Sequence, residues 1–394
     1  MYGLVLEGGG TKGAYQIGAY EALVHEGIEI SAVVGTSIGA INGAMILQGD
    51  LELCKKLWEN IDYSMVIDME EAEFEKLSKL SLDKEDILYG LEKIKDLIKE
   101  GGLDISPLKL TLDKYIDEEK IRNSKKDFGI VTYNLSNLGA RKLFLEDIAQ
   151  GDLKKYILAS AYLPVFKFER LNGNLYIDGA FADNLPFSML EERGYERLII
   201  IRIYGRGITR KIENENHIVI SPREDLGPTL DFNPDRVSYN IRLGYYDTLR
   251  TLRGLLGGSY YMEDDLGEDG ALDFWSGLEM PRLEEACQLF HLTKPARRAV
   301  FEDLIPRLAG YLDLGEDYGY LDVLVGLVDY KLLGLGLERF KVYSLSQALD
   351  LARSGRLEKP GEARGLLDRL RERVDLPLVG REEALRELAN ILLS

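Results

Sequence analysis

Cysteine and histidine are both scarce in this chain of 394 residues, which has two cysteines and three histidines. Cys54 and Cys287 lie far apart in the sequence and outside any CxxC pattern. A disulfide framework is therefore not indicated, and reduced thiols in a reducing compartment are expected. With three histidines, the chain offers few candidates for the base that usually activates a hydroxyl nucleophile.

Positive charge is also in short supply, with 49 Lys and Arg against 67 Asp and Glu and a net charge of -18. Nucleic acid and strongly anionic bilayers are thus poor electrostatic partners, and any membrane contact is expected to be transient, local and hydrophobic. The longest helical apolar segment, residues 37–48, is shorter than the ~20 residues of a spanning helix. The N-terminus carries no apolar signal, which favours a cytoplasmic protein.

Continuous apolar runs bounded by turns predict buried parallel strands. They are Leu4-Val5-Leu6, Ala32-Val33-Val34, Ile130-Val131-Thr132 and Leu198-Ile199-Ile200-Ile201. Helical patterns lie between them, and the first, Ala14 to Glu26, has small residues at Ala14, Gly18 and Ala22 that are expected to pack closely on the sheet. A second small face, which includes Gly39 and Gly43, follows Ser37. The chain is therefore predicted to be an α/β protein with helices layered on a sheet.

The stretch Gly35-Thr36-Ser37-Ile38-Gly39 follows the second apolar run and precedes a helix-forming segment. A serine on a sharp strand-to-helix turn crowds its own backbone, and glycines two residues to either side remove the Cβ atoms that would clash. The pattern predicts a nucleophile elbow with Ser37 as the nucleophile. A glycine-rich turn with Ser37 as a helix cap is the plainer alternative.

Two further segments favour the nucleophile. Glu7-Gly8-Gly9-Gly10-Thr11-Lys12-Gly13 follows the first strand, and its backbone N–H groups can hold a negative oxygen. Asp178-Gly179-Ala180 follows Leu175-Tyr176-Ile177 and places a carboxylate at a strand end. Serine, anion-binding glycines and an aspartate together make up a catalytic group.

With these motifs the chain resembles the patatin-like phospholipases, lipid acyl hydrolases that use a Ser-Asp dyad. The resemblance covers about residues 1–256 and also includes Ala159-Ser160-Ala161-Tyr162-Leu163-Pro164 and Asn184-Leu185-Pro186. It implies a three-layer α/β/α hydrolase core with a parallel-rich central sheet, and a reaction that needs no metal or cofactor. By position it implies Ser37 as nucleophile and Asp178 as base, Gly8, Gly9 and Gly10 as the oxyanion hole, and Lys12, Gly13, Gly35, Gly39 and Gly179 as supporting motif residues.

The residues themselves favour Asp178 over histidine as the base. His25 falls in the first helix, and His217 and His291 lie in segments without turn glycines or a neighbouring acid. An exposed carboxylate is a poor base for a serine proton, so the site is expected to be partly dry, which raises the proton affinity of Asp178.

A nucleotide site is the main alternative for the glycine loop, because Gly8, Gly10 and Gly13 also satisfy the GxGxxG fingerprint. That interpretation needs an acidic residue at the end of the next strand, which instead ends in Gly35-Thr36-Ser37. A Walker loop is excluded because Gly13 follows Lys12 where Ser or Thr is required.

The length of the chain predicts either two domains or one catalytic domain with an appended region. A boundary near residue 220 is compatible with a change in basic residues, from 19 Lys and 8 Arg up to residue 220 to 4 Lys and 18 Arg thereafter. A catalytic domain would span residues 1–220, with a helical insertion at about 60–126. The mainly helical C-terminal region would span 221–394, and its first part, to about 256, is a candidate to complete the catalytic domain. Within the insertion, Ile87, Leu91, Ile94 and Ile98 predict an amphipathic helix, either a lid or a packed flank.

The sequence thus predicts a serine lipid acyl hydrolase that acts on phospholipids or other acyl esters. The alternatives are a non-lipid carboxylesterase or thioesterase with a His-completed triad, and a nucleotide-binding or inactive scaffold protein. Tyr260-Tyr261-Met262 and Phe274-Trp275 are expected to be core residues, with lipid contact as the alternative.

Overall fold

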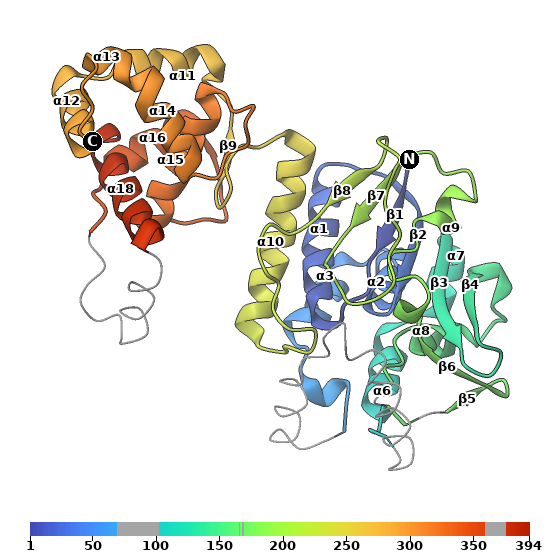
Figure 1. Ribbon diagram of the computed structural model, residues 1–394. Coiled ribbons are helices and arrows are strands. Elements are labelled where there is room, and N and C mark those ends of the chain that lie inside the picture. Colours follow the sequence, from blue (N-terminus) through green and yellow to red (C-terminus); the bar gives the residue numbers. More distant parts are fainter. Residues whose placement is uncertain (69–101, 165, 168, 359–375) are drawn as a thin grey trace. The chain divides into compact units, whose positions relative to one another are not determined.

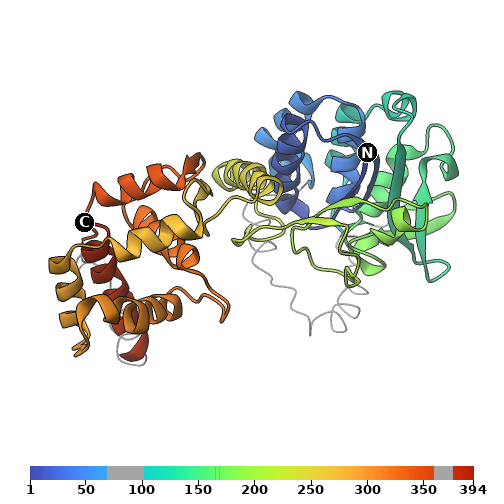
Figure 2. The same ribbon diagram turned by 90° about the horizontal axis from the view of Figure 1, so that it is seen from above.

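The computed structural model describes residues 1–68, 102–164, 166–167, 169–358 and 376–394. These residues form two compact units, Met1–Leu252 and Arg253–Ser394, called unit 1 and unit 2 below. The boundary at residues 252 and 253 lies within the segment from 221 to about 256 that the sequence marked as a candidate part of the first domain. Figures 1 and 2 show each unit from two directions.

A mixed sheet forms the centre of unit 1 (Figure 1). Its strands lie in the order β5-β6-β3-β2-β1-β7-β8, and β4 pairs with β3. The strands are β1 (Tyr2–Leu6), β2 (Ile30–Thr36), β3 (Asp127–Asn134), β4 (Gly139–Phe144), β5 (Arg170–Leu171), β6 (Asn174–Asp178), β7 (Leu198–Ile201) and β8 (Ile218–Ile220). The run from β3 through β2, β1 and β7 to β8 is parallel, whereas β4 and β6 run antiparallel to β3. The predicted apolar runs all lie in the parallel part.

The register of the parallel strands brings their carboxyl ends to one edge of the sheet. Leu6 of β1 lies opposite Gly35 of β2 and Ile201 of β7. The loops that follow these strands therefore start side by side. The glycine loop and the serine turn, 30 residues apart in sequence, meet at this edge for that reason.

Alternate strand residues pack against different layers. Val5, Val34 and Ile200 form a core cluster with Phe187 and Leu190 around the short helix α9. On the opposite face, a Cβ at Gly43 of α2 would be 3.0 Å from Val33 and 3.1 Å from Phe128. The sheet is thus covered on both faces, as the hydrophobic runs of its strands require.

The remaining elements of unit 1 are helices and short 3-10 turns. They are η1 (Gly10–Gly13), α1 (Ala14–His25), α2 (Ile38–Leu47), α3 (Leu51–Glu59), η2 (Tyr63–Met65), α6 (Ser106–Tyr115), α7 (Glu118–Asn123), η3 (Leu145–Asp147), α8 (Leu153–Ser160), η4 (Gly179–Phe181), α9 (Ser188–Glu191) and α10 (Pro234–Arg253), whose last residue belongs to unit 2.

The small face of α1 packs against a helix at Gly18, where the sequence predicted packing on the sheet. A Cβ at Gly18 would lie 1.8 Å from the carbonyl oxygen of Ile241, and one at Gly244 would lie 2.0 Å from that of Tyr15. Helices α1 and α10 therefore approach each other backbone to backbone. The expectation was wrong here because i, i+4 spacing identifies a small face but not the element that it meets.

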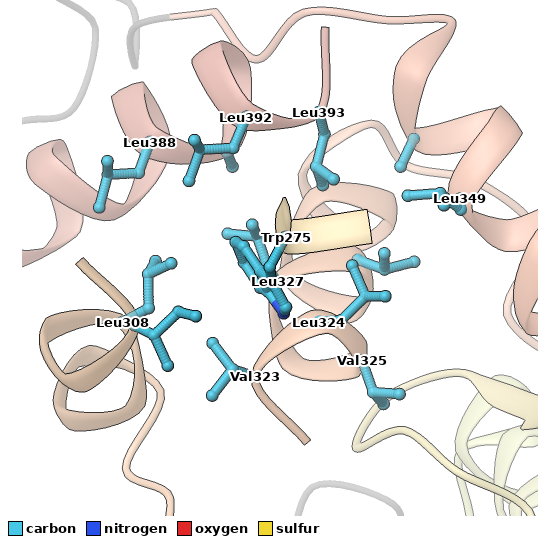
Figure 3. Close-up of a cluster of buried hydrophobic side chains, with 14 of the residues drawn as sticks. Trp275, Leu308, Val323, Leu324, Val325, Leu327, Leu349, Leu388, Leu392 and Leu393 are labelled. Carbon is cyan, nitrogen blue, oxygen red and sulfur yellow. The ribbon is translucent and has the colours of Figure 1, made fainter. Parts of the chain in front are cut away.

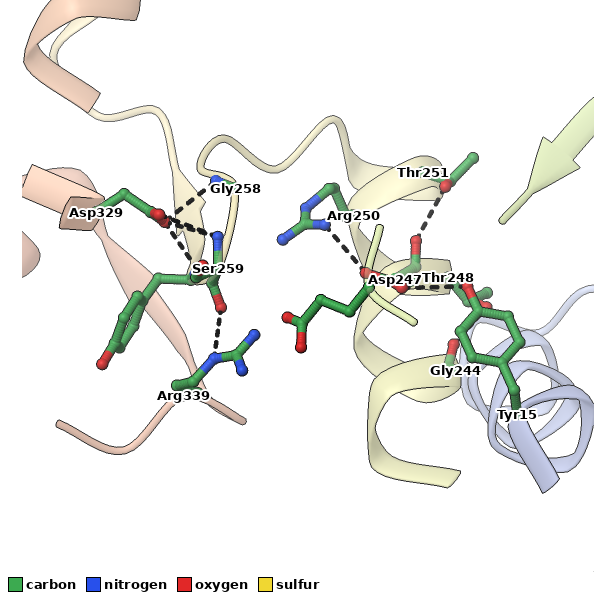
Figure 4. Close-up of polar contacts among 12 residues, drawn as sticks. Tyr15, Gly244, Asp247, Thr248, Arg250, Thr251, Gly258, Ser259, Asp329 and Arg339 are labelled. Carbon is green, nitrogen blue, oxygen red and sulfur yellow. Dashed lines mark hydrogen bonds and ion pairs between the residues drawn. The ribbon is translucent and has the colours of Figure 1, made fainter. Parts of the chain in front are cut away.

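Polar contacts fasten α10 within unit 1 (Figure 4). Tyr15 Oη donates to Asp247 Oδ2 at 3.2 Å, and Arg250 Nη1 pairs with Asp247 Oδ1 at 3.0 Å. Asp247 and Arg250 are 3% and 7% exposed, so this carboxylate is held in the interior. The helix is thus an integral part of the sheet-containing unit.

Unit 2 consists mainly of helices around an apolar core. Its elements are β9 (Tyr261–Glu263), α11 (Gly267–Ser276), α12 (Met280–Leu289), α13 (Ala296–Ala299), a π-helical turn η5 (Val300–Leu304), α14 (Ile305–Tyr311), α15 (Tyr320–Gly334), β10 (Val342–Ser344), α16 (Leu345–Arg353) and α18 (Leu376–Leu392). Strand β9 pairs with β10 in parallel. Figure 3 shows Trp275 among leucines and valines of α14, α15, α16 and α18.

The sequence predicted that the aromatic segments at 260–262 and 274–275 lie in a core, with lipid contact as the alternative, and most of these side chains are buried. Tyr260, Tyr261, Met262 and Trp275 are at most 1% exposed. The predicted amphipathic helix at residues 87–98 lies outside the described residues. The predicted α/β core with a parallel-rich sheet and a mainly helical C-terminal region is confirmed.

In the part of the chain described here, no helix combines the length and the hydrophobicity needed to cross a bilayer.

Candidate active site

Ser37 stands at the junction between β2 and α2, on a turn with unusual backbone geometry. Its φ and ψ are 56° and -125°, in a region that few non-glycine residues adopt, and it is 9% exposed. A Cβ at Gly35 would lie 2.3 Å from the backbone of Gly39, and one at Gly39 would lie 2.3 Å from the carbonyl oxygen of Leu6. The two glycines thus let α2 start directly against the strand ends, and this close approach holds the serine on the sharp turn.

Asp178 comes from the end of β6 and reaches the serine. Ser37 Oγ donates a hydrogen bond of 2.6 Å to Asp178 Oδ2, and the backbone N–H of Ala180 donates to Asp178 Oδ1 at 2.8 Å. Strand β6 pairs antiparallel with β3, so Asp178 lies opposite Thr132. Strand β3 in turn lies between β6 and β2, the strand that ends just before Ser37. The two predicted site residues, 141 positions apart, are therefore in direct contact.

Burial controls the protonation of this carboxylate. Asp178 is 1% exposed, and its desolvation raises its pKa from 3.8 to about 6, although the hydrogen bonds from Ser37 and Ala180 lower it in part. The carboxylate is charged at neutral pH, and its proton affinity is well above that of a carboxylate in water. With its pKa closer to neutral pH, Asp178 is a better proton acceptor for catalysis than an exposed aspartate.

A second serine fixes the backbone of the turn. Ser160 Oγ accepts from the N–H of Ser37 at 2.9 Å and donates to the carbonyl oxygen of Val131 at 2.6 Å. Ser160 is fully buried at the end of α8. It thereby links the turn at Ser37 to β3, the strand that pairs with β6 and so positions Asp178. The sequence pointed to the segment around Ser160 but gave it no role.

The glycine loop runs beside the serine. A Cβ at Gly8 would be 3.1 Å from the Cβ of Ser37 and 2.3 Å from Asn184 Oδ1. The N–H of Gly8 donates to the carbonyl oxygen of Asn184 at 3.1 Å, and Asn184 Nδ2 donates to the carbonyl oxygen of Gly8 at 3.1 Å. This hydrogen bond occupies the N–H of Gly8, one of the three oxyanion donors that the sequence predicted; the other two are Gly9 and Gly10. Within the described residues the N–H groups of these two make no backbone hydrogen bond.

The other supporting residues also lie at this edge. Gly10 has a φ of +60°, Gly13 faces Ile38 of α2, and Gly179 lies against the carbonyl of Val131, where a Cβ would be 2.2 Å away. Lys12 is half-buried in η1, beside the loop. The geometry does not connect Lys12 with the Ser37–Asp178 pair.

A buried polar network joins the glycine loop to the helix of the nucleophile. Gln16 Nε2 donates to the carbonyl oxygen of Glu7 at 2.7 Å, and Asn42 Nδ2 donates to Gln16 Oε1 at 2.9 Å and to the carbonyl oxygen of Gly13 at 3.0 Å. Trp58 Nε1 completes the set with a bond of 3.0 Å to Asn42 Oδ1. Both ends of the loop are therefore held from α1 and α2. No sequence motif marked these residues, and the only signal was amide side chains in otherwise apolar helices.

The carboxylate of Glu7 fixes the neighbouring loop after β7. Glu7 is fully buried, and its Oε2 accepts from the N–H groups of Ile203 and Tyr204 at 2.7 and 2.9 Å. Its Oε1 pairs with Arg202 at 3.2 Å. Glu7 therefore serves as a structural anion at the rim of the site.

The structure does not join any of the three histidines to the Ser37–Asp178 pair. His217 Nε2 lies 3.0 Å from Glu191 Oε1, so it does have an acidic neighbour, contrary to the sequence expectation. His217 immediately precedes β8, and the parallel register places it at the edge opposite Ser37. His25 contacts the hydroxyl of Tyr245 at 3.1 Å, and His291 lies in unit 2.

Parts of this chain are similar to known proteins. Residues 4–190 match the family model described as patatin-like phospholipase. Patatin-like phospholipase domain-containing protein 7 of Rattus norvegicus is 27% identical over 214 residues, which cover 52% of this chain and 14% of that protein. Lysophospholipase NTE1 of Kluyveromyces lactis is 26% identical over 206 residues, covering 49% and 12%. The matched segments thus cover less than a fifth of the length of each of these two relatives.

A solved structure shows a looser likeness. The crystal structure of VipD from Legionella pneumophila has a TM-score of 0.40 and 14% identity, with 100% of this chain and 90% of that chain covered.

Proposed function

Because residues 4–190 of this chain match the family model of the patatin-like phospholipases, we propose that the protein is a serine hydrolase that cleaves the acyl esters of phospholipids or related lipids. The observation that carries the proposal is the hydrogen bond of 2.6 Å between Ser37 Oγ and Asp178 Oδ2. It joins a strained, glycine-flanked serine to a dry carboxylate. The name of the lysophospholipase relative supports a phospholipid or lysophospholipid as substrate.

In the first half-reaction, Ser37 Oγ attacks the ester carbonyl carbon while Asp178 takes the hydroxyl proton. The carbonyl oxygen becomes an oxyanion, and the N–H groups of Gly9 and Gly10 are the donors assigned to it. Loss of one such donor typically costs ~10²–10³ in rate, so the loop matters as much as the pair. The intermediate then collapses, and the departing alcohol takes the proton from Asp178.

In the second half-reaction, water replaces the alcohol. Asp178 accepts a proton from the water as its oxygen attacks the acyl-serine, and it returns that proton to Ser37 Oγ as the fatty acid leaves. One carboxylate thus serves both steps, and no histidine takes part. The pKa of about 6 fits this role, because Asp178 is ionised before each attack and can still hold a proton between steps.

Labelling with a fluorophosphonate probe tests the proposal directly. Mass spectrometry of the labelled protein should find the adduct on Ser37, and Ser37→Ala should take up no label. His217→Ala is the matched control and should be labelled at the wild-type rate, because His217 lies at the opposite sheet edge. An adduct on another serine, or labelling that depends on a histidine, would contradict the Ser-Asp assignment.

Substrate class is a separate question with its own comparison. Hydrolysis of micellar phospholipid should exceed hydrolysis of short soluble p-nitrophenyl esters if the site serves lipids. A preference for the soluble esters would instead support a non-lipid carboxylesterase.

A further inference from the structure

Residues 204–211, called the rim loop below, expose large apolar side chains. The loop follows β7 and has the sequence Tyr-Gly-Arg-Gly-Ile-Thr-Arg-Lys. Tyr204 is 53% exposed and Ile208 is 58% exposed, and every residue from 206 to 211 is exposed. Exposed apolar groups that lie next to a site for an apolar substrate call for a functional explanation.

Backbone contacts place the rim loop beside the candidate active site. A Cβ at Gly205 would lie 1.7 Å from the carbonyl oxygen of Gly8. The N–H of Ile208 donates to the carbonyl oxygen of Ala180 at 2.9 Å, and its own carbonyl oxygen accepts from the N–H of Asn184 at 2.6 Å. The loop therefore bridges the glycine loop and the turn that follows Asp178.

The rim loop is also positively charged in an otherwise acidic chain. Arg206, Arg210 and Lys211 are exposed, and no Asp or Glu occurs from 204 to 211, whereas the whole chain has a net charge of -18. Arg210 and Lys211 form no ion pair with any residue that the structure describes. The positive stretch ends before Glu213.

We infer that the rim loop docks the protein on an anionic bilayer, with Tyr204 and Ile208 in the interface and the basic side chains on lipid phosphates. This inference rests on the proposed function, because it explains how the site reaches a lipid that is packed in a membrane. Tyrosine suits the boundary between water and acyl chains. Each Arg or Lys near an anionic surface strengthens binding roughly fivefold. The local charge thus overrides the expectation, drawn from the net charge, that anionic bilayers are poor partners.

Vesicle sedimentation tests the inference. The parent is Ser37→Ala, which prevents turnover, and the vesicles contain phosphatidylcholine with or without phosphatidylglycerol. The double variant Arg210→Gln/Lys211→Gln should bind the anionic vesicles roughly 25-fold more weakly. Tyr204→Ser/Ile208→Ser should weaken binding to both kinds of vesicle.

Matched controls come from the opposite edge of the sheet. Lys125→Gln/Lys126→Gln removes the same charge from an exposed pair that precedes β3, and Val24→Ser removes an apolar side chain that is 44% exposed at the end of α1. Both should bind like the parent. Equal losses in the lysine pair and the rim-loop pair would overturn the inference, as would a parent that does not bind anionic vesicles.

A soluble ester separates this inference from the proposed function. Rim-loop variants with Ser37 intact should hydrolyse a short p-nitrophenyl ester at the wild-type rate. If no ester is hydrolysed but vesicle binding still depends on the loop, the proposed function fails and the docking surface stands. Circular dichroism melts of each variant exclude loss of fold as the cause.

Discussion

The two units differ in what their interiors contain. Unit 1 buries many polar and charged side chains, among them Glu7, Gln16, Asn42, Asp178 and Asn184. Within the described part of unit 2, the buried polar residues are Asp329, Lys331 and Asn390. Both units also contain a core of buried apolar side chains.

The buried polar groups of unit 2 all satisfy backbone atoms of the same unit. Asp329 accepts from the N–H groups of residues 258–260, and its contacts with Gly258 and Ser259 appear in Figure 4. Lys331 Nζ donates to two carbonyl oxygens near the end of α18. Asn390 exchanges two hydrogen bonds with the backbone of Leu357. These side chains complete the packing of a helical unit.

Several buried polar groups of unit 1 instead surround the serine turn and the glycine loop, and one of them, Asp178, opposes folding when it is ionised. Burial of Asp178 raises its pKa, so the ionised carboxylate is less stable in the folded protein than in the unfolded chain. Burial also lowers the pKa of Lys331 in unit 2, to about 8, but the Lys331 ammonium donates to backbone carbonyl oxygens, whereas Asp178 accepts from the hydroxyl of Ser37. We infer from this difference that Asp178 is retained for its chemistry. Four predictions test this distinction.

The largest expected effect is on the rate. Asp178→Asn should lower kcat for ester hydrolysis by about 10²–10⁴-fold, because the variant has no base within reach of Ser37. Asn390→Ala is the control from unit 2, since it removes a buried polar side chain and should leave kcat unchanged below its unfolding temperature. Steady-state kinetics measure both, and a comparable loss in the two variants would erase the functional contrast between the units.

The next effect is on stability and concerns unit 2. Leu327 is fully buried in α15 and belongs to the core shown in Figure 3. Leu327→Ala should reduce the free energy of unfolding of this unit by about 2–5 kcal/mol, through lost burial and a cavity. Urea unfolding measures the change, and kcat in the folded range should remain at the wild-type value. A loss below about 1 kcal/mol would mean that the core collapses around the smaller residue.

Asp178→Asn should also change how stability depends on pH. Because the folded pKa of Asp178, about 6, exceeds the unfolded value near 3.8, the wild-type protein binds a proton more tightly when folded and loses stability as pH rises through this interval. The asparagine variant lacks that loss. Its stability relative to wild type should therefore be about 3 kcal/mol greater at pH 8 than at pH 3.

Urea unfolding of both proteins across this pH range provides the measurement. Other titrating groups are common to the two proteins and largely cancel. A relative stability that does not change with pH would show that Asp178 is not desolvated as strongly as its burial indicates.

The smallest effect concerns the polar network around the glycine loop. Gln16→Met keeps the side-chain length but removes the hydrogen bonds to Asn42 and to the carbonyl of Glu7, so the loop should lose its fixed position. We expect kcat to fall about tenfold, or ~1.4 kcal/mol in the barrier, with little change in KM for a soluble ester. Gln48→Met is the control, because Gln48 bonds to the backbone of Tyr115 and Asp117 at the far end of α2. A fall in thermal stability with kcat unchanged would assign Gln16 a structural role alone.

Local patterns predicted the parallel strands and the turn at Ser37 because each depends on residues close together in sequence. Apolar runs mark the strands, and glycines two residues either side of a serine mark the turn. The aspartate was recognisable for the same reason, since Asp178 ends a strand and Gly179 follows it. The contact between Ser37 and Asp178 needed the fold, because β6 reaches the site only through its antiparallel pairing with β3.

The roles of Ser160 and Asn184 escaped prediction because they arise from distant partners. Ser160 holds the Ser37 backbone across 123 positions, and Asn184 holds Gly8 across 176. An isolated amide or hydroxyl has no periodicity that reveals its partner. The same limit explains two of the wrong expectations, that the small face of α1 packs on the sheet at Gly18 and that His217 has no acidic neighbour.

Helices α1 and α10 cross at Gly18 and Gly244 with their backbones in contact, and this crossing should control how fast the nearby amide protons exchange. No side chain separates the two helices there, so partial opening cannot admit water between them without pulling the backbones apart. Amide protons around residues 15–19 and 241–244 should therefore exchange with deuterium slowly, through complete opening of the unit. Their exchange rates would record the unfolding of unit 1 in the intact protein, independently of the state of unit 2.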